Sequence, residues 1–190
     1  MSKTLLTRTA RTHLAPQWQP AWDMLNQLTG SATFVEVFAQ APQLLEFVMD
    51  AFYRKLFFGG QVQERYKQLA RLRLSLLHGC QTCNRQNIPG ALAAGFTQAQ
   101  IDALIREDFT PFDAAEHAVI DYASQVALTN MDGTLRPALL DALRAHFSEA
   151  DILELGTVMA VISGMAKLSF VLDLVDKEGY CPFARHSAAA

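Results

Sequence analysis

The chain has 190 residues, of which 51% are hydrophobic and 18% are charged, and its formal net charge is -3. This composition excludes a disordered chain, and the slight negative charge argues against non-specific nucleic-acid binding. We therefore expect the partners to be small molecules and other proteins. The high apolar content indicates a large core, or apolar surface that is buried between subunits.

The first 22 residues contain no acidic side chain, and Pro16 and Pro20 interrupt any amphipathic helix there. We interpret residues 1–22 as an N-terminal arm and not as a transit peptide. The most apolar stretch, residues 153–175, includes three charged side chains, so the sequence predicts no membrane span. We expect a cytoplasmic protein, in which a CxxC pair indicates redox or metal chemistry more often than a structural disulfide.

The rest of the chain is typical of an all-α protein, because no segment alternates between polar and apolar residues over a strand's length. Residues 23–178 form the expected helical domain, and residues 179–190 form a C-terminal tail. The predicted helix starts are Thr97 with Gln100, Thr110 before Pro111, Thr134, and Ser148 with Asp151. Glycines at 30, 59–60 and 95 separate the earlier helices. The last helix is expected to run to about Val175, with an apolar arc wide enough for a bundle centre or a subunit interface.

The segment LHGCQTCNRQN holds Cys80 and Cys83, two of the three cysteines. A helix that begins near Cys80 would place this sulfur at its N-terminus, where the backbone stabilises a thiolate. Two thiols at this spacing can form a redox-active disulfide, contribute to a metal site, or pack as small hydrophobic groups. Zinc is the weakest of these, since neither His78, His117, His186 nor Cys181 has ligand spacing. We expect no metal and no cofactor.

On the preceding helix, a polar stripe leads to Cys80, and it consists of Gln68, Arg71, Ser75 and His78. Arg71 could lower the pKa of a thiol by its charge. His78 is the best candidate for a catalytic base, although a surface or capping role is also open. Arg73 falls inside the apolar arc, so it requires a carboxylate partner or must extend past its neighbours into solvent.

The residues FYRKLFFGGQVQERYKQLARLRLSLLHGCQTC and GALAAGFTQAQIDAL resemble the carboxymuconolactone decarboxylase/AhpD-like family. The resemblance covers roughly residues 35–175. It implies an all-helical bundle that assembles as a homotrimer or homohexamer. It also implies a peroxidase that reduces hydroperoxides with the CxxC pair and is recharged by a lipoyl- or thioredoxin-like dithiol protein. By this resemblance Cys83 attacks the peroxide and Cys80 resolves it, whereas the helix terminus favours Cys80 as the more acidic thiol.

The sequence departs from the family's pattern at the proton relay. The glutamate and histidine of that relay are replaced by Gln68 and Asn87, and an amide cannot act as a general base near neutral pH. His78 and, less directly, Glu64 are the remaining candidates for proton transfer. Pro89 is a second departure, and we expect it to kink or end its helix about one turn after Asn87.

Three functions remain open at this point. The first is a thiol-disulfide oxidoreductase or hydroperoxidase that uses Cys80 and Cys83. The second is a non-enzymatic redox sensor or ligand-binding protein, and the third is a decarboxylase or lactone-processing enzyme. Cys181 is interpreted as a free cysteine in the tail, and the histidines at 13, 117, 146 and 186 as surface or core residues.

Overall fold

The computed structural model describes residues 5–184, which form helices connected by short loops. The α-helices are α1 (Gln19–Thr29), α2 (Thr33–Phe38), α3 (Pro42–Glu46), α4 (Glu64–His78), α5 (Gln81–Ala93), α6 (Gln98–Ile105), α7 (Ala114–Val126), α8 (Pro137–Arg144) and α9 (Glu149–Val171). Two short 3-10 helices, η1 (Arg11–His13) and η2 (Pro16–Trp18), precede α1, and a π-helix, η3 (Phe47–Phe57), continues α3. Between residues 5 and 184 there is no strand, which confirms the all-α prediction.

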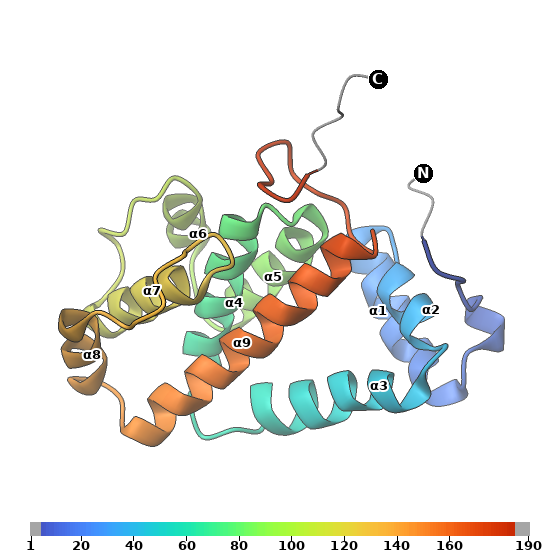
Figure 1. Ribbon diagram of the computed structural model, residues 1–190, viewed down its shortest axis with the longest axis horizontal. Helices are drawn as coiled ribbons and strands as arrows, with labels where there is room; N and C mark the ends of the chain where they lie inside the picture. The colour runs from blue at the N-terminus through green and yellow to red at the C-terminus, as the bar shows by residue number, and fades with distance from the viewer. Residues whose placement is uncertain (1–4, 185–190) are drawn as a thin grey trace.

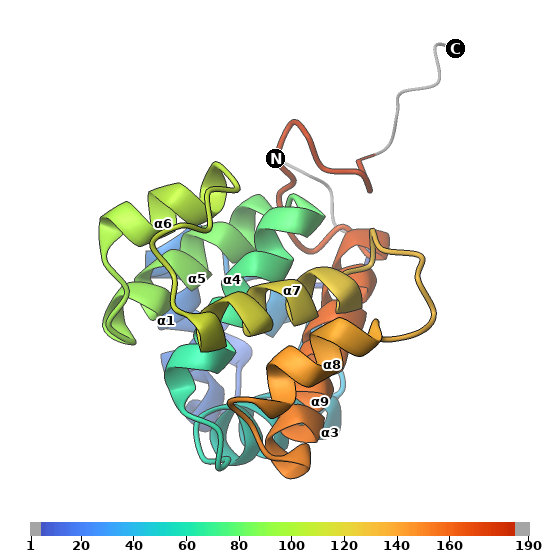
Figure 2. The same cartoon turned by 90° about the vertical axis from the view of Figure 1, so that its left-hand side faces the viewer.

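Helix α4 lies at the centre of the molecule and packs against α5, α7 and α9. Helices α4 and α5 lie between α7 and α1, and α9 runs across the molecule with α7 and α8 to one side and α1 and α2 to the other (Figure 1 and Figure 2). The main hydrophobic core joins α4 to the helices from α6 to α9. A second core holds α1, α2 and α3 together with Leu14 and Leu174. A cavity beside Cys80 and Cys83 lies where these two parts meet.

Two of the predicted helix starts are confirmed. Thr97 and Ser148 are N-caps, and each forms a capping box with the residue three positions later. The other two predicted N-caps are wrong, Thr110 by three residues and Thr134 by two. Helix α7 begins after Asp113, whose side chain forms its own capping box with Glu116, and α8 begins at Pro137. Where several cap residues are close together, the one that completes a reciprocal pair determines the start.

The N-terminal segment is more structured than the predicted arm. Pro16 and Pro20 lie in the first turns of η2 and α1, so they start these helices and do not interrupt them. The predicted boundary after residue 22 therefore falls within α1. Leu14 is buried in the second core, and Arg8 forms an ion pair with Glu36 of α2. This segment is part of the folded unit, and α1 forms one wall of the cavity.

Helix α9 ends at Val171, four residues before the predicted end, and Asp173 has a positive φ of 56°. By length and composition alone, α9 could cross a membrane. One side of it packs against α4, α7 and η3. The opposite side leaves Leu153, Leu168 and Val171 exposed. The wide apolar arc predicted from the sequence is therefore only partly covered within one chain.

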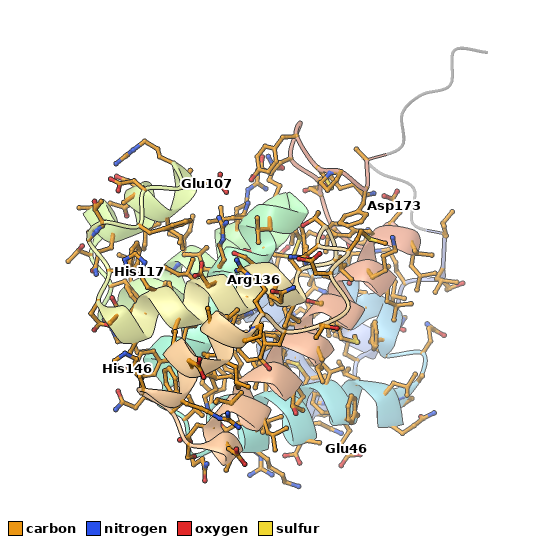
Figure 3. The ribbon with its side chains drawn as sticks, turned by 60° about the vertical axis from the view of Figure 1, so that its left-hand side comes forward. Glu46, Glu107, His117, Arg136, His146 and Asp173 are labelled. Atoms are coloured by element: carbon orange, nitrogen blue, oxygen red, sulfur yellow. A yellow bond between two sulfur atoms is a disulfide. The ribbon has the colours of Figure 1, made fainter. Side chains whose placement is uncertain are left out.

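Two buried cations of α4, Arg73 and Lys67, find partners on other elements. The guanidinium of Arg73 lies 3.1 Å from Glu107, on the turn after α6 (Figure 3), and donates to the Ser124 hydroxyl. This confirms the prediction of a carboxylate partner. Lys67 is 1% exposed and pairs with Glu154 of α9 at 3.0 Å. These contacts fix α4 relative to its neighbours.

Candidate functional site

The cysteine pair lies where α4 ends and α5 begins. Helix α4 ends at Gly79, whose φ of 61° is in the left-handed region that suits glycine, and Cys80 is the N-cap of α5 as predicted. Cys80 and Cys83 are joined by a disulfide, with their Cα atoms 5.2 Å apart. The Cys80 sulfur also accepts a hydrogen bond from the backbone N–H of Cys83, at 3.2 Å. Both sulfur atoms therefore lie at a helix N-terminus, which stabilises a thiolate when the pair is reduced.

The two cysteines differ in accessibility. Cys80 is 0% exposed, whereas Cys83 is half-buried. The segment after α9 covers Cys80, because Lys177 forms a backbone bridge with it and the N–H of Glu178 donates to the Gly79 carbonyl at 2.9 Å. Cys83 is thus the more accessible residue of the pair. The sequence did not indicate this cover, since its contacts join residues about 100 positions apart.

A cavity of about 710 Å³ adjoins the pair and is lined by residues of α1, η3, α4, α5 and α9. Both cysteines and all four members of the predicted polar stripe contribute to its wall. The opposite wall is mainly apolar, and its side chains include Met24, Leu25, Leu28, Phe34, Val48, Phe52, Ile162 and Met165. This volume suits a small organic ligand. The apolar wall was missed from the sequence, because its residues look like ordinary core positions and the start of α1 falls in the predicted arm.

The two amides at the relay positions face this cavity. Gln68 is 3% exposed, and its Nε2 donates to Glu64 Oε1 at 3.0 Å. Asn87 is 2% exposed, and its Nδ2 donates to the Arg71 carbonyl at 3.3 Å. Neither Gln68 Oε1 nor Asn87 Oδ1 has a hydrogen-bond donor within the described chain. The structure thus brings the two predicted positions into one cavity and leaves an unsatisfied acceptor on each.

Pro89 and Gly90 shape the wall beside Gln68. Helix α5 continues through Pro89 to Ala93, so of the two expected effects of Pro89, a kink or an end, the end is wrong. Gly90 lies against the Gln68 side chain, and a Cβ at this position would come within 2.8 Å of Gln68 Oε1. The Pro-Gly sequence therefore gives Gln68 room without breaking α5.

Arg71 lies in the same wall and is 6% exposed. Its guanidinium carbon lies 5.2 Å from the ring centre of Tyr53 and 5.5 Å from that of Phe57, both on η3. The π-helix presents these two rings to α4, and cation–π contacts of this kind hold a guanidinium in position.

The His78 side chain is buried and hydrogen-bonded to the backbone, whereas a catalytic base needs a free nitrogen. It is 1% exposed, and its Nε2 accepts a hydrogen bond from the Leu128 backbone N–H at 3.0 Å. Burial lowers the pKa of His78 to about 4, so the imidazole is neutral at neutral pH. The lone pair that would take a proton is already used, which favours a structural role. His78 as the base remains a prediction without geometric support.

The remaining predicted residues lie outside the reacting centre. Cys181 is free and buried, and its sulfur donates to the His78 carbonyl at 3.1 Å. His117 and His146 are exposed on the side formed by α6–α8, as Figure 3 shows, while His186 lies outside the described residues. From residue 5 to residue 184, no group of three or more His, Cys, Asp or Glu side chains could hold a metal ion.

Comparison with known proteins agrees with this architecture. Residues 42–125 match the sequence model of the Carboxymuconolactone decarboxylase family. This match covers 84 of the 190 residues, and it confirms the resemblance to the family that the sequence motifs indicated. The matched region includes η3, α4 and α5, and so contains both cysteines, Arg71 and the two amides. The comparison with curated proteins finds no match.

Solved structures share the fold across most of the chain. A protein from Ralstonia eutropha JMP134, peroxidase-related and with an alkylhydroperoxidase AhpD core, has a TM-score of 0.73 at 12% identity, covering 94% of each chain. The debrominase Bmp8 bound to 2,3,4-tribromopyrrole has a TM-score of 0.72 at 17% identity, covering 93% of each chain. A protein from Agrobacterium tumefaciens, provisionally assigned to antioxidant defence as AhpD, has a TM-score of 0.63 at 20% identity, covering 72% of this chain and 92% of that one. The predicted AhpD-like helical fold is confirmed.

Proposed function

We propose that the protein is a cysteine-pair oxidoreductase that reduces an apolar hydroperoxide. The observation that carries the proposal is the unequal exposure of two bonded cysteines beside an organic-sized cavity. Cys83 attacks, since this residue is half-buried at the cavity, and Cys80 resolves, since this residue is fully buried and its sulfur is bonded to that of Cys83. The fold shared with a peroxidase-related protein that has an AhpD core supports peroxide reduction as the reaction.

The reaction balances with the two thiols as the only reductant. The Cys83 thiolate attacks the terminal peroxide oxygen, the O–O bond breaks, and an alcohol leaves with a proton from solvent. The resulting sulfenic acid is then attacked by Cys80, which forms the disulfide and releases water. A dithiol protein of lipoyl or thioredoxin type would reduce the disulfide by exchange.

Proton transfer sets the limit on this activity. Gln68 and Asn87 can orient a water molecule but cannot remove a proton near neutral pH. General acid–base catalysis typically contributes about 10²- to 10⁴-fold. We therefore expect slower peroxide reduction than an enzyme with a complete relay would show, and a rate that follows the thiol pKa.

Steady-state consumption of cumene hydroperoxide with dihydrolipoamide as the reductant tests the proposal. Wild-type protein and Cys181→Ser should be equally active, whereas Cys83→Ser should be inactive. Cys181 is the matched control because it is a buried thiol on the segment that covers Cys80. Equal rates in wild-type protein and Cys83→Ser would refute the proposal.

Reductive dehalogenation is the second candidate. The large apolar cavity and the fold shared with Bmp8 favour it. In this reaction Cys83 would take the halogen, solvent would supply the proton to carbon, and Cys80 would displace halide to form the disulfide. Bromide release from 2,3,4-tribromopyrrole, measured by ion chromatography with the same variants, separates it from peroxide reduction.

A further inference from the structure

Arg71 is a buried cation for which residues 5–184 provide no charged partner. It is 6% exposed, yet no carboxylate or carbonyl oxygen of these residues accepts a hydrogen bond from its side chain. Within this part of the chain its guanidinium interacts with the rings of Tyr53 and Phe57. Buried charges in proteins are normally paired, because removing them from water costs several kcal/mol.

Other cations on α4 show what the fold does when a charge serves structure. Arg65 pairs with Glu116 at 2.5 Å, Lys67 with Glu154, and Arg73 with Glu107. Arg71 differs from these in facing the cavity. Its missing partner is therefore expected to be something that enters the cavity.

Two unsatisfied acceptors lie on the same wall. Gln68 Oε1 is on the same face of α4, one turn before Arg71, and Asn87 Oδ1 belongs to the side chain that donates to the Arg71 carbonyl. The bond from Gln68 to Glu64 and the bond from Asn87 to Arg71 fix the amide orientations, so both oxygens remain available. Leaving such atoms unpaired is unfavourable, because they lose the hydrogen bonds that they would form with water. A ligand with a hydroxyl or N–H group, or a bound water, would satisfy them.

The facing wall has the opposite character. Side chains from α1, η3 and α9 make it apolar, among them Leu28, Phe52 and Met165. A ligand that suits both walls has an apolar body and an anionic end that pairs with Arg71, while bound water donates to the two amide oxygens. Cys83 lines the same cavity, so the body of such a ligand would lie against the sulfur that attacks.

We propose that this site selects an apolar organic anion, with its carboxylate or phenolate-type group on Arg71 and its chain or ring along the wall of α1, η3 and α9. This proposal rests on the proposed function and specifies its substrate class. The planar guanidinium binds a carboxylate through two parallel hydrogen bonds. The same charge disfavours a cationic end at this wall.

Isothermal titration calorimetry on the disulfide-bonded protein tests the proposal without any turnover. The probes are decanoate, decanol and decylammonium, which share one chain and differ in charge. Decanoate should bind about 10- to 100-fold more tightly than decanol, as expected for hydrogen bonds to a charged group. Decylammonium should show no binding. Equal affinity for decanoate and decanol in wild-type protein would overturn the proposal.

The variant Arg71→Met should invert this preference, so that decanol binds more tightly than decanoate. Arg144→Met is the matched control, because Arg144 is an exposed arginine of α8 away from the cavity, and it should retain the wild-type preference. If Arg71→Met retained the preference for decanoate, another group would bind the anion and the proposal would be wrong. If this variant did not fold, the comparison of the three probes on wild-type protein would still decide the question.

Failure of this proposal can be distinguished from failure of the proposed function. A protein that prefers decanoate but does not reduce peroxide through Cys83 would keep the anion site and lose the oxidoreductase assignment. A protein that reduces cumene hydroperoxide but binds decanol and decanoate equally would keep the enzyme and lose the anion site.

Discussion

The Lys67–Glu154 pair determines how the π-helix and α4 are held against α9, and we predict that Glu154→Gln destabilises the protein strongly. Lys67 donates to Glu154 Oε1 at 3.0 Å and to the Leu56 carbonyl at 3.1 Å. The same carboxylate accepts from the backbone N–H groups of Gln61 and Val62, at 2.9 and 3.2 Å. One side chain therefore ties the turn before α4 to α9.

The size of the effect follows from burial. The side chains of Lys67 and Glu154 are 1% and 10% exposed. Removing one partner of such a pair costs about 3–5 kcal/mol, because the other charge remains buried and uncompensated. The substituted glutamine keeps a carbonyl oxygen for the backbone donors, so we expect the lower figure, about 3 kcal/mol. For a chain of this length this corresponds to a fall in Tm of roughly 6–12 °C.

Thermal unfolding followed by circular dichroism measures this change. Glu149→Gln is the control, since it breaks the exposed Arg144–Glu149 pair and should cost no more than about 1 kcal/mol. The double variant Lys67→Met/Glu154→Gln should regain at least half of the loss, because it leaves no buried cation at this position. If Glu154→Gln and Glu149→Gln had the same Tm, the buried pair would not stabilise the fold as we reason.

Three further predictions concern the site. The free energy of unfolding should fall by roughly 3 kcal/mol as the pH drops from about 6.5 toward 4, because the pKa of His78 is about 4 in the folded protein and about 6.5 in the unfolded chain. In urea titrations at several pH values, His78→Gln should make this pH dependence weaker. An unchanged pH dependence in the variant would contradict the prediction. Iodoacetamide should modify Cys83 in Cys80→Ser much faster than Cys80 in Cys83→Ser, measured by intact mass; equal rates would show that burial does not separate the thiols. Gly79→Ala should lower the free energy of unfolding by at least about 1–2 kcal/mol, since the φ of this residue is positive and the new Cβ would lie 2.6 Å from the Cys181 Cα. If the variant had the same Tm as the wild-type protein, the segment that covers Cys80 would move freely.

The sequence predicted a helix start correctly where a capping box with both of its partners was recognised. The capping boxes at Thr97 and Ser148 are confirmed because both partners lie within four residues. The predicted start of α7 is misplaced, because Asp113 with Glu116 competes with Thr110 and forms the better box. Pro20 resembles a helix breaker in the sequence, although the first turn of a helix tolerates proline.

The polar half of the site could be predicted, but the apolar half could not. Gln68, Arg71 and Asn87 follow from helical spacing and the family pattern, and they share one cavity wall. The rings that hold Arg71 belong to η3, the element before α4, and the segment that covers Cys80 follows about 100 residues later. Their contacts depend on tertiary packing, for which a single sequence contains no periodic signal.

The most direct test of the central claim is the rate at which peroxide oxidises the reduced cysteine pair. Reduced protein is mixed with one equivalent of cumene hydroperoxide, quenched with an alkylating agent at set times, and weighed intact. The account predicts that two alkylation sites disappear together, faster than a free thiol reacts, and that peptide mapping gives a Cys80–Cys83 disulfide while Cys181 stays reduced. If both thiols of the pair are still fully alkylated after long exposure, the pair is not a peroxide-reactive centre and the oxidoreductase assignment is wrong.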